Sequence, residues 1–323
     1  MTGYEPTNPW SQYAGVIYSN KPNAVHQLKK QAENKWNGLV TKASVAGEFN
    51  ILPNLKYKSS IAVDLYRAKS SSFTPKYHLD GDEFSVDAKV GKYMDESDYW
   101  VFDNYLTYDN RWDEHAINAM LGTSAEKTRS EFLNASKDGM VTNDSSLHII
   151  DAGTKNPFAS GNHWVTSMNS YFARVFYSYK DRYMATLNYR RDGTSKFASG
   201  NRWGNFPSLS LAWNFSEESF LKNASWLDLG KLRFSWGEIG NQNVSLGAYL
   251  DQYGNKIHYM FGDTPYLGGG VNSKGNPKLK WETTRQLDLG LDLTFLSGSL
   301  RTSFDYYKRD TKNMLIQVPN ASI

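Results

Sequence analysis

Between Gln286 and Tyr307 the sequence alternates apolar and polar residues in two stretches, QLDLGLDLTF and SLRTSFDYY, separated by a break at residues 296–298. Successive side chains of a β-strand point to opposite faces, so this pattern predicts a hairpin with one apolar and one polar face. The apolar face of its first strand comprises Leu287, Leu289, Leu291, Leu293 and Phe295, and the opposite face comprises Asp288, Asp292 and Thr294.

The segment FARVFYSYKDRYMATLNYRRDG, residues 172–193, repeats this pattern. A chain built from such hairpins needs an apolar layer against every strand. The sequence offers no helical layer that would cover them, whereas a lipid bilayer would. The pattern therefore favours a transmembrane β-barrel.

Composition agrees with this interpretation. The 323 residues are 15% aromatic and 40% hydrophobic, and the mean hydropathy is −0.60. No stretch approaches the roughly 18 apolar residues of a membrane helix, but barrel strands need only alternate residues to be apolar. The chain has no cysteine, which excludes disulfides, thiolate metal sites and cysteine nucleophiles. The net charge of +3 comes without a basic block, so no nucleic-acid partner is expected.

Ten strands are predicted from the pattern, and their connections alternate between short and long. The strands are expected at residues 39–50, 55–66, 99–108, 115–127, 170–179, 183–191, 207–215, 231–238, 283–295 and 299–309. The long connections are expected at residues 67–98, 128–169, 192–206 and 239–282, and residues 216–230 occupy a short-side position that begins with a short helix. Outer-membrane barrels have short periplasmic turns and long extracellular loops, so strict alternation is expected.

A soluble β-sandwich or β-solenoid would also alternate apolar and polar residues. The predicted strands are longer than the roughly five or six residues usual in soluble sheets. Aromatic residues also cluster toward strand ends, at Tyr177, Tyr179, Tyr183, Trp213 and Trp236, where membrane girdles lie. The alternative function that corresponds to a soluble fold is a carbohydrate-binding or adhesin protein.

Catalytic and metal-binding signals are weak. The histidines are dispersed without metal-ligand spacing, and no local signature supports a Ser-His-Asp set. Asp80, Asp82 and Glu83 lack the full pattern of an EF-hand, so we interpret them as a solvated loop. We expect no enzyme activity and no cofactor.

One resemblance is specific. Residues 169–243 and 276–319 resemble the barrel of SusC/RagA-like TonB-dependent outer-membrane transporters of Bacteroidota, in both their strands and their loop sequences RRDGTSKF, NRWGNFPS, WGEIGNQN and NPKLKWE. Residues 102–122, FDNYLTYDNRWDEHAINAMLG, are also similar to the family, while the other loops before residue 169 are individual.

The resemblance implies import of glycans or peptides across the outer membrane of a Gram-negative cell. Family members form a barrel of about twenty-two strands around a plug. The TonB complex energises transport through the plug, and a SusD-like surface lipoprotein caps the barrel. No signal peptide, plug or TonB box is found in residues 1–323, and Ile323 follows soon after the tenth strand. We therefore expect a partial barrel domain over 1–323, without the plug and the C-terminal strands.

Candidate lumen residues are assigned to strand tops and to one long loop. They are Arg190, Asp192, Arg233 and Glu238 at the strand tops, together with Trp203 and Phe206 in the loop, whose rings could stack on sugars. Each of them could instead serve loop packing or barrel solubility. The sequence does not identify the imported ligand.

Overall fold

A computed structural model describes residues 24–78, 84–144, 147–221 and 224–314. The chain divides into two compact units. The first unit comprises Met1–Ala43, Val63–Tyr99 and Thr128–Val165, and the second comprises Ser44–Ala62, Trp100–Lys127 and Thr166–Ile323. Asp80, Asp82 and Glu83, the loop carboxylates considered above, lie outside the described residues.

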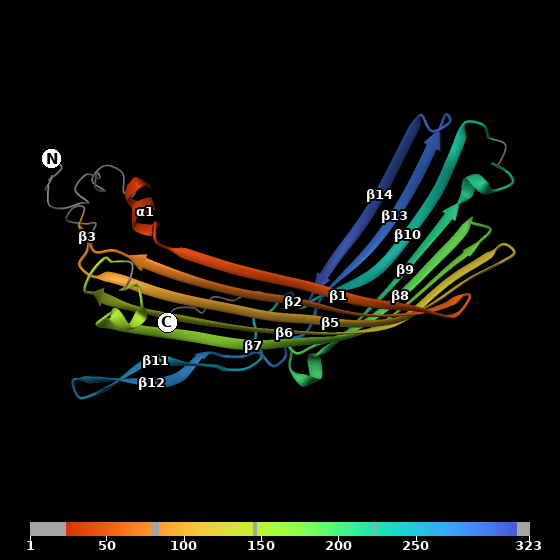
Figure 1. Cartoon of the computed structure of the whole chain (residues 1–323). Helices are drawn as coiled ribbons and strands as arrows, with labels where there is room; N and C mark the ends of the chain where they lie inside the picture. The colour runs from red at the N-terminus through yellow and green to blue at the C-terminus, as the bar shows by residue number, and fades with distance from the viewer. Residues whose placement is uncertain (1–23, 79–83, 145–146, 222–223, 315–323) are drawn as a thin grey trace. The chain divides into compact units, whose positions relative to one another are not determined.

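Ten long strands form one sheet in which each strand is hydrogen-bonded to the next (Figure 1). In sheet order they are β1 (Lys35–Leu52), β2 (Leu55–Thr74), β5 (Ala88–Trp112), β6 (His115–Met140), β7 (Lys155–Tyr179), β8 (Tyr183–Thr194), β9 (Trp203–Asn214), β10 (Leu227–Asn241), β13 (Glu282–Phe295) and β14 (Leu300–Lys312). The pairs from β7 to β14 are all antiparallel.

Smaller elements occupy the connections. Helix α1 (Ala24–Gln31) precedes β1, and two hairpins are formed by β3 (Tyr77–His78) with β4 (Phe84–Ser85) and by β11 (Gln252–Phe261) with β12 (Thr264–Ser273). Short 3-10 helices span Ile150–Ala152, Ser199–Asn201 and Phe215–Glu217. None of the helices in the described ranges has the length and hydropathy required to cross a membrane.

The tight turns use left-handed backbone conformations. Lys180 and Asp181 have φ values of 56° and 52° between β7 and β8, and Leu296, Ser297 and Gly298 have 56°, 55° and 83° between β13 and β14. Turns with positive φ match the right-handed twist of paired strands, which explains why such short segments can close these hairpins.

All ten predicted strands are confirmed, but several are much longer than expected. Residues 67–74 and 88–98, predicted as connection, belong to β2 and β5, while 128–140 and 155–169 belong to β6 and β7. The prediction failed there because both faces of these strand segments are polar, so the sequence no longer alternates between apolar and polar residues. The backbones nevertheless remain paired. Strict alternation of connection lengths is also wrong, since residues 215–226 form a longer connection than residues 195–202. The expected short helix there is confirmed at Phe215–Glu217.

Strand register in the second unit sorts side chains onto two faces, because directly paired residues share a face. One row of paired residues runs from β7 to β14 as Tyr177, Ala185, Leu211, Phe234, Leu289 and Tyr306. The adjacent row, on the opposite face, runs as Phe176, Thr186, Ser210, Ser235, Asp288 and Tyr307. We call these the apolar face and the polar face.

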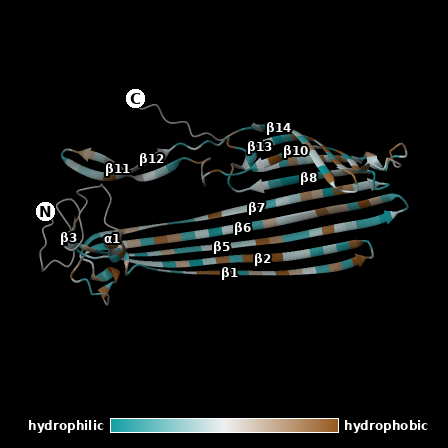
Figure 2. Ribbon diagram, turned by 90° about the horizontal axis from the view of Figure 1, so that it is seen from above, coloured by the Kyte–Doolittle hydropathy of each residue, from teal (hydrophilic) through white to brown (hydrophobic). Residues whose placement is uncertain are grey.

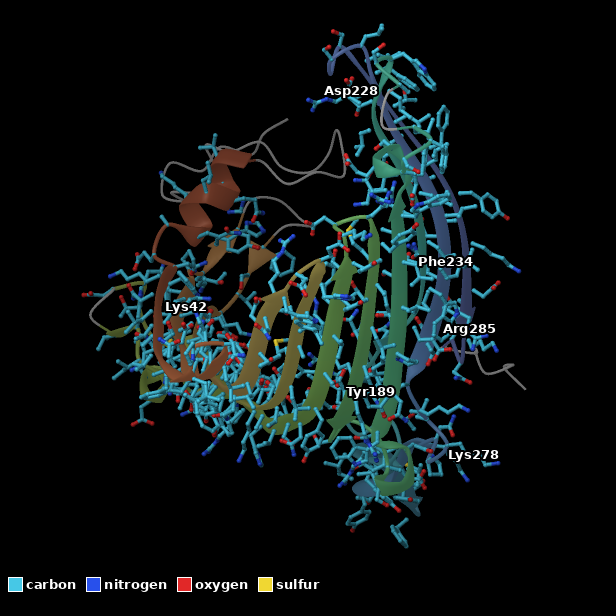
Figure 3. The ribbon with its side chains drawn as sticks, turned by 90° about the vertical axis from the view of Figure 1, so that its right-hand side faces the viewer. Lys42, Tyr189, Asp228, Phe234, Lys278 and Arg285 are labelled. Carbon is cyan, nitrogen blue, oxygen red and sulfur yellow. The ribbon has the colours of Figure 1, made fainter. Side chains whose placement is uncertain are left out.

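The large side chains of the apolar face are uncovered. Leu211 is 44% exposed, Leu289 is 45% exposed and Tyr306 is 66% exposed. Hydrophobic and hydrophilic residues alternate along the strands in Figure 2, and Tyr189, Phe234 and Arg285, all on this face by register, are labelled in Figure 3. By contrast, the buried clusters belong to connections and strand ends.

Candidate functional site: the polar face

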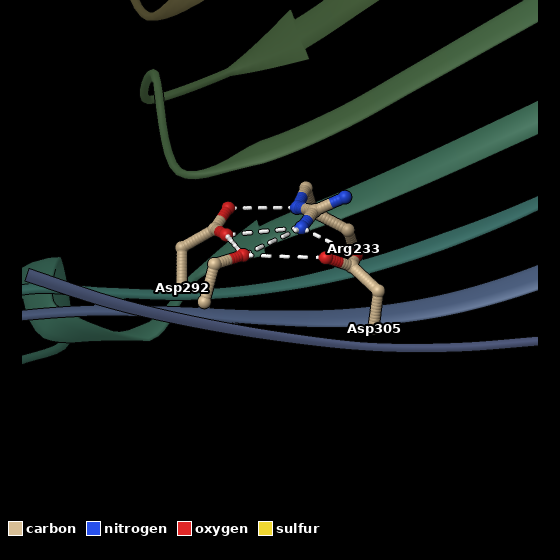
Figure 4. Close-up of polar contacts among 4 residues, drawn as sticks. Arg233, Asp292 and Asp305 are labelled. Atoms are coloured by element: carbon tan, nitrogen blue, oxygen red, sulfur yellow. Dashed lines mark hydrogen bonds and ion pairs between the residues drawn. The ribbon is translucent and has the colours of Figure 1, made fainter.

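Arg233 of β10 is the centre of a charged network on the polar face (Figure 4). Its Nε donates to Asp292 Oδ2 at 2.7 Å, and its Nη2 donates to Asp292 Oδ1 at 2.9 Å and to Asp305 Oδ1 at 2.8 Å. Ser303 joins the network by donating to Asp292 Oδ1 at 2.8 Å. The three neighbouring strands β10, β13 and β14 are thus linked by side chains as well as by backbone.

Glycine makes room for this network. Gly290 pairs directly with Arg233, and a Cβ atom at Gly290 would lie 2.5 Å from Arg233 Cζ. The guanidinium therefore packs over the bare backbone of β13, where two carboxylates can reach it. With one arginine and two aspartates, the network carries a net negative charge when all three are ionised.

A second charged cluster lies on the same face at β7 and β8. Arg190 Nε donates to both oxygens of Asp192, at 2.8 and 2.9 Å, and Arg190 Nη2 donates to Ser170 Oγ at 2.9 Å. Asp192 is 7% exposed and Ser170 is 2% exposed. The Arg190 guanidinium also lies 5.7 Å from the centre of the Phe172 ring. Pairing and hydrogen bonding compensate the burial of these charges.

A shallow hollow of about 380 Å³ lies beside Arg233. Its lining includes the hydroxyls of Thr186, Ser210 and Ser235 and the charged side chains of Lys231 and Asp288. Such a surface can form hydrogen bonds with a polar ligand. In the described ranges, no three His, Asp or Glu side chains are grouped to hold a metal ion.

The predicted lumen residues do not all share this face. Register places Arg190, Asp192 and Arg233 on the polar face and Glu238 on the opposite face. Glu238 accepts hydrogen bonds from Arg285 Nε at 3.0 Å and Nη2 at 2.7 Å.

Trp203 also lies on the apolar face, at the opposite strand ends from the short turns. Its ring stacks on Tyr171 with centroids 5.9 Å apart, and the Arg191 guanidinium lies 5.0 Å from its centre. Trp203 pairs directly with Gly193, and the indole packs where a Cβ atom at residue 193 would lie. Trp203 and Arg233 therefore cannot line one surface.

Phe206 is part of a buried aromatic cluster. It is 8% exposed and packs with Phe197, 0% exposed, and Trp281, 6% exposed. Trp281 Nε1 donates to the carbonyl of Arg202 at 2.8 Å, which fixes the 195–202 connection against the start of β13. The ring of Phe206 is thus occupied by packing, and stacking on a sugar would require this cluster to open.

Aromatic side chains on the apolar face line the ends of β7 to β9 near the short turns. Tyr179 stacks on Tyr183 with centroids 6.4 Å apart, and both Tyr183 Oη and Trp213 Nε1 donate to Glu218 Oε1. Arg182 Nη1 donates to Glu218 Oε2 at 2.9 Å. The hydrogen bonds from Tyr183 and Trp213, together with the Arg182 charge, lower the pKa of Glu218. Four of the five predicted end aromatics lie near strand ends, but Trp236 lies within β10.

The sequence identified Arg190, Asp192 and Arg233 but did not group them with Ser170 or Asp305. The alternation pattern placed Asp292 on the polar face of β13. Its hydrogen bonds to Arg233 could not be predicted in the same way, because they depend on the register between β10 and β13. Trp281 lies in the loop sequence NPKLKWE, which signalled the family but gave no packing role.

Comparison with known proteins identifies related chains. SusC, a TonB-dependent receptor of Bacteroides thetaiotaomicron, is 30% identical over 322 residues, which is 98% of this chain and 31% of SusC. TonB-dependent receptor P3 of Formosa agariphila is 31% identical over 278 residues, 86% of this chain and 28% of that receptor. This chain thus spans less than a third of each of these relatives.

The fold is also similar to that of a solved structure. A structure of the RagAB peptide transporter superposes with a TM-score of 0.80 at 21% identity, covering 93% of this chain and 33% of that one. The family described as TonB dependent receptor-like, beta-barrel matches residues 2–323. This chain therefore belongs to the TonB-dependent receptors and falls within their β-barrel.

Proposed function

We propose that this chain supplies barrel strands of an outer-membrane importer that takes up oligosaccharides or peptides. The whole receptor would contain further strands and a plug energised by the TonB complex, and a SusD-like surface lipoprotein would load the ligand. The family assignment and the similarity to SusC and to the RagAB peptide transporter support this proposal.

The observation that carries the proposal is the separation of the two faces. Large side chains such as Leu289 and Phe304 are exposed on the apolar face, at 45% and 61%. On the polar face, charged groups are paired with one another, as Arg233 is with Asp292 and Asp305. A barrel that presents one face to lipid and the other to a polar lumen has this arrangement, whereas a soluble sheet would cover its apolar face.

Arg190, Asp192 and Arg233 are assigned to the lumen under this proposal. Leu287, Leu289, Leu291, Leu293 and Phe295 would contact lipid. Trp203 and Glu238, at the ends of the apolar face, would lie at a membrane interface, where aromatic and charged side chains are both accommodated. We propose no catalytic role for any of these residues.

Topology in intact cells tests the proposal. We expect connections 195–202 and 242–281 on the cell surface and connection 296–299 in the periplasm. Ser199, Ser273 and Ser297 are all exposed, and no native cysteine of residues 1–323 would compete with single cysteines placed at these positions.

In the full-length receptor, Ser199→Cys and Ser273→Cys should react with an impermeant maleimide on intact cells. Ser297→Cys should react only after the outer membrane is permeabilised. Equal labelling of Ser297→Cys and Ser199→Cys on intact cells would contradict the topology, and loss of the receptor from the outer-membrane fraction would contradict the proposed location.

A further inference from the structure

A hollow of about 720 Å³ in the first unit is lined by lysines from three neighbouring strands. Lys35 comes from β1, Lys69 from β2 and Lys92 from β5. Ser70, Ser71 and Asn37 add hydroxyl and amide groups to the lining. Lys92 Nζ donates to Ser71 Oγ at 2.6 Å, so these two strands present the lysines on one face.

Among the residues that the structure describes, the three lysines have no carboxylate partner. In the described part of the chain, neither Lys35, Lys69 nor Lys92 forms an ion pair, although the nearby Arg67 contacts Asp98 at 2.5 Å and Glu96 at 3.5 Å. This hollow therefore concentrates positive charge that no ion pair among the described residues neutralises.

Glu33 is the acidic residue in the lining, and it is already engaged. Its Oε2 lies 3.1 Å from His148 Nδ1, and the His148 ring stacks on buried Phe73 with centroids 3.5 Å apart. These contacts hold Glu33 at the edge of the hollow and fix its wall, so the cationic surface is preorganised for an anion.

Two of the lysines, Lys35 and Lys69, lie on the faces of β1 and β2 that also carry exposed leucines. Lys69 is four residues from Leu65 on β2, on the same face and about 13 Å further along the strand. Lys35 has the same relation to Leu39 on β1. Leu65 is 36% exposed and Leu39 is 63% exposed. The opposite face of these strands is separate, since Lys42 pairs there with Asp64 at 2.6 Å.

We propose that this hollow binds the phosphate group of an anionic membrane lipid whose acyl chains lie against the exposed leucines. Cationic side chains next to a membrane attract anionic lipids, and lysine with serine hydroxyls is suited to phosphate oxygens. The proposal rests on the proposed contact of the leucine-bearing face with lipid. Because Lys35 and Lys69 share a face of β1 and β2 with the exposed leucines, a lipid fits better than a free anion.

Lipid binding to the purified full-length receptor tests this inference. The probes are phosphatidic acid and phosphatidylcholine with identical dioleoyl chains, titrated into detergent-solubilised receptor and followed by native mass spectrometry. The test variant is Lys35→Gln/Lys69→Gln/Lys92→Gln. The control is Lys42→Gln/Lys56→Gln/Lys58→Gln, which removes the same charge from the opposite face of β1 and β2.

The wild type and the control should prefer phosphatidic acid over phosphatidylcholine, and the test variant should lose roughly fivefold of that preference for each lysine removed. An unchanged preference in the test variant would overturn the inference. If millimolar inorganic phosphate competes for the hollow as effectively as the lipid does, the inference is also overturned, because the site would then take a free anion.

The two proposals can fail separately. If the leucine-bearing face does not contact lipid, the wild type will bind neither dioleoyl lipid. If only the lysine assignment is wrong, the wild type will bind both lipids with equal affinity.

Discussion

The two faces of the sheet in the second unit differ in how their side chains are partnered, although they share one backbone. On the polar face, Arg233 donates hydrogen bonds to Asp292 and Asp305, so the ionised side chains are partnered within the protein. On the apolar face, Leu289 and Phe234 lie directly opposite each other, and Leu289 remains 45% exposed. One face thus carries its own partners, whereas the other needs an external apolar partner.

Alternation sets the polarity of each face, whereas strand register sets its interactions. Leu289 would lie on the apolar face whichever residue it paired with. Arg233, however, reaches Asp292 and Asp305 only because β10, β13 and β14 are aligned in this register. Substitutions on the two faces should therefore fail for different physical reasons.

The largest expected effect is a charge on the apolar face. Leu289→Arg should cost about 2–4 kcal/mol of folding stability near the bilayer midplane, because lipid cannot solvate the guanidinium. Asp288→Arg, one residue away on the polar face, should cost less than about 1 kcal/mol. The measurement is the unfolding free energy of the full-length receptor in lipid, and equal costs would show that the faces are misassigned.

Loss of the central arginine should have the next largest effect. Arg233→Met should cost about 1–3 kcal/mol, since Asp292 and Asp305 are left adjacent without a cation. A double-mutant cycle with Asp292→Asn should give a coupling of about 0.5–3 kcal/mol. Additive costs in that cycle would mean that the network is not a unit.

Gly290→Ala tests the same charged network, with a smaller expected effect. The new methyl group would displace the Arg233 guanidinium, because a Cβ atom there lies 2.5 Å from Cζ. A cost of about 1 kcal/mol is expected in the wild type, and almost none in the Arg233→Met background. An equal cost in both backgrounds would attribute the effect to the backbone rather than to the arginine.

The smallest expected effect concerns Glu218 beside the short turns. Because the pKa of this carboxyl is lowered in the folded state, ionisation of Glu218 stabilises the fold above the ordinary Glu pKa, and this contribution is lost as pH falls through the lowered value. Glu218→Gln should therefore be less stable than the wild type at neutral pH, and the difference should shrink below about pH 4.3. Denaturant midpoints at several pH values measure it, and a constant difference would contradict the role of ionisation.

The sequence was sufficient for the ten strands and for the faces of β13. Alternation is a local property, so Leu287 to Phe295 could be sorted without knowledge of their neighbours. Residues 128–140 were missed because strand pairing there continues without an alternating apolar signal. Alternation alone also separates Glu238 from Arg233, because the two residues lie an odd number of positions apart in β10. The prediction that grouped both in the lumen followed their charge instead.

Long-range contacts were beyond the sequence for a similar reason. Phe197 and Trp281 meet only because the 195–202 and 242–281 connections fold toward each other. The lysine hollow likewise combines residues from β1, β2 and β5 with His148, which no local pattern brings together.

The most direct test of the central claim is a nitroxide scan along β13 in the full-length receptor, reconstituted in lipid. Single cysteines at positions 286–293 would carry the label, in a receptor in which every cysteine outside residues 1–323 is replaced by serine; residues 1–323 contain none. Oxygen should collide most with labels at positions 287, 289, 291 and 293, and a water-soluble nickel chelate most with labels at 286, 288, 290 and 292. If the accessibility to oxygen and the accessibility to the nickel chelate instead rise and fall together along the strand, the sheet does not have one face in lipid and the other in a polar lumen.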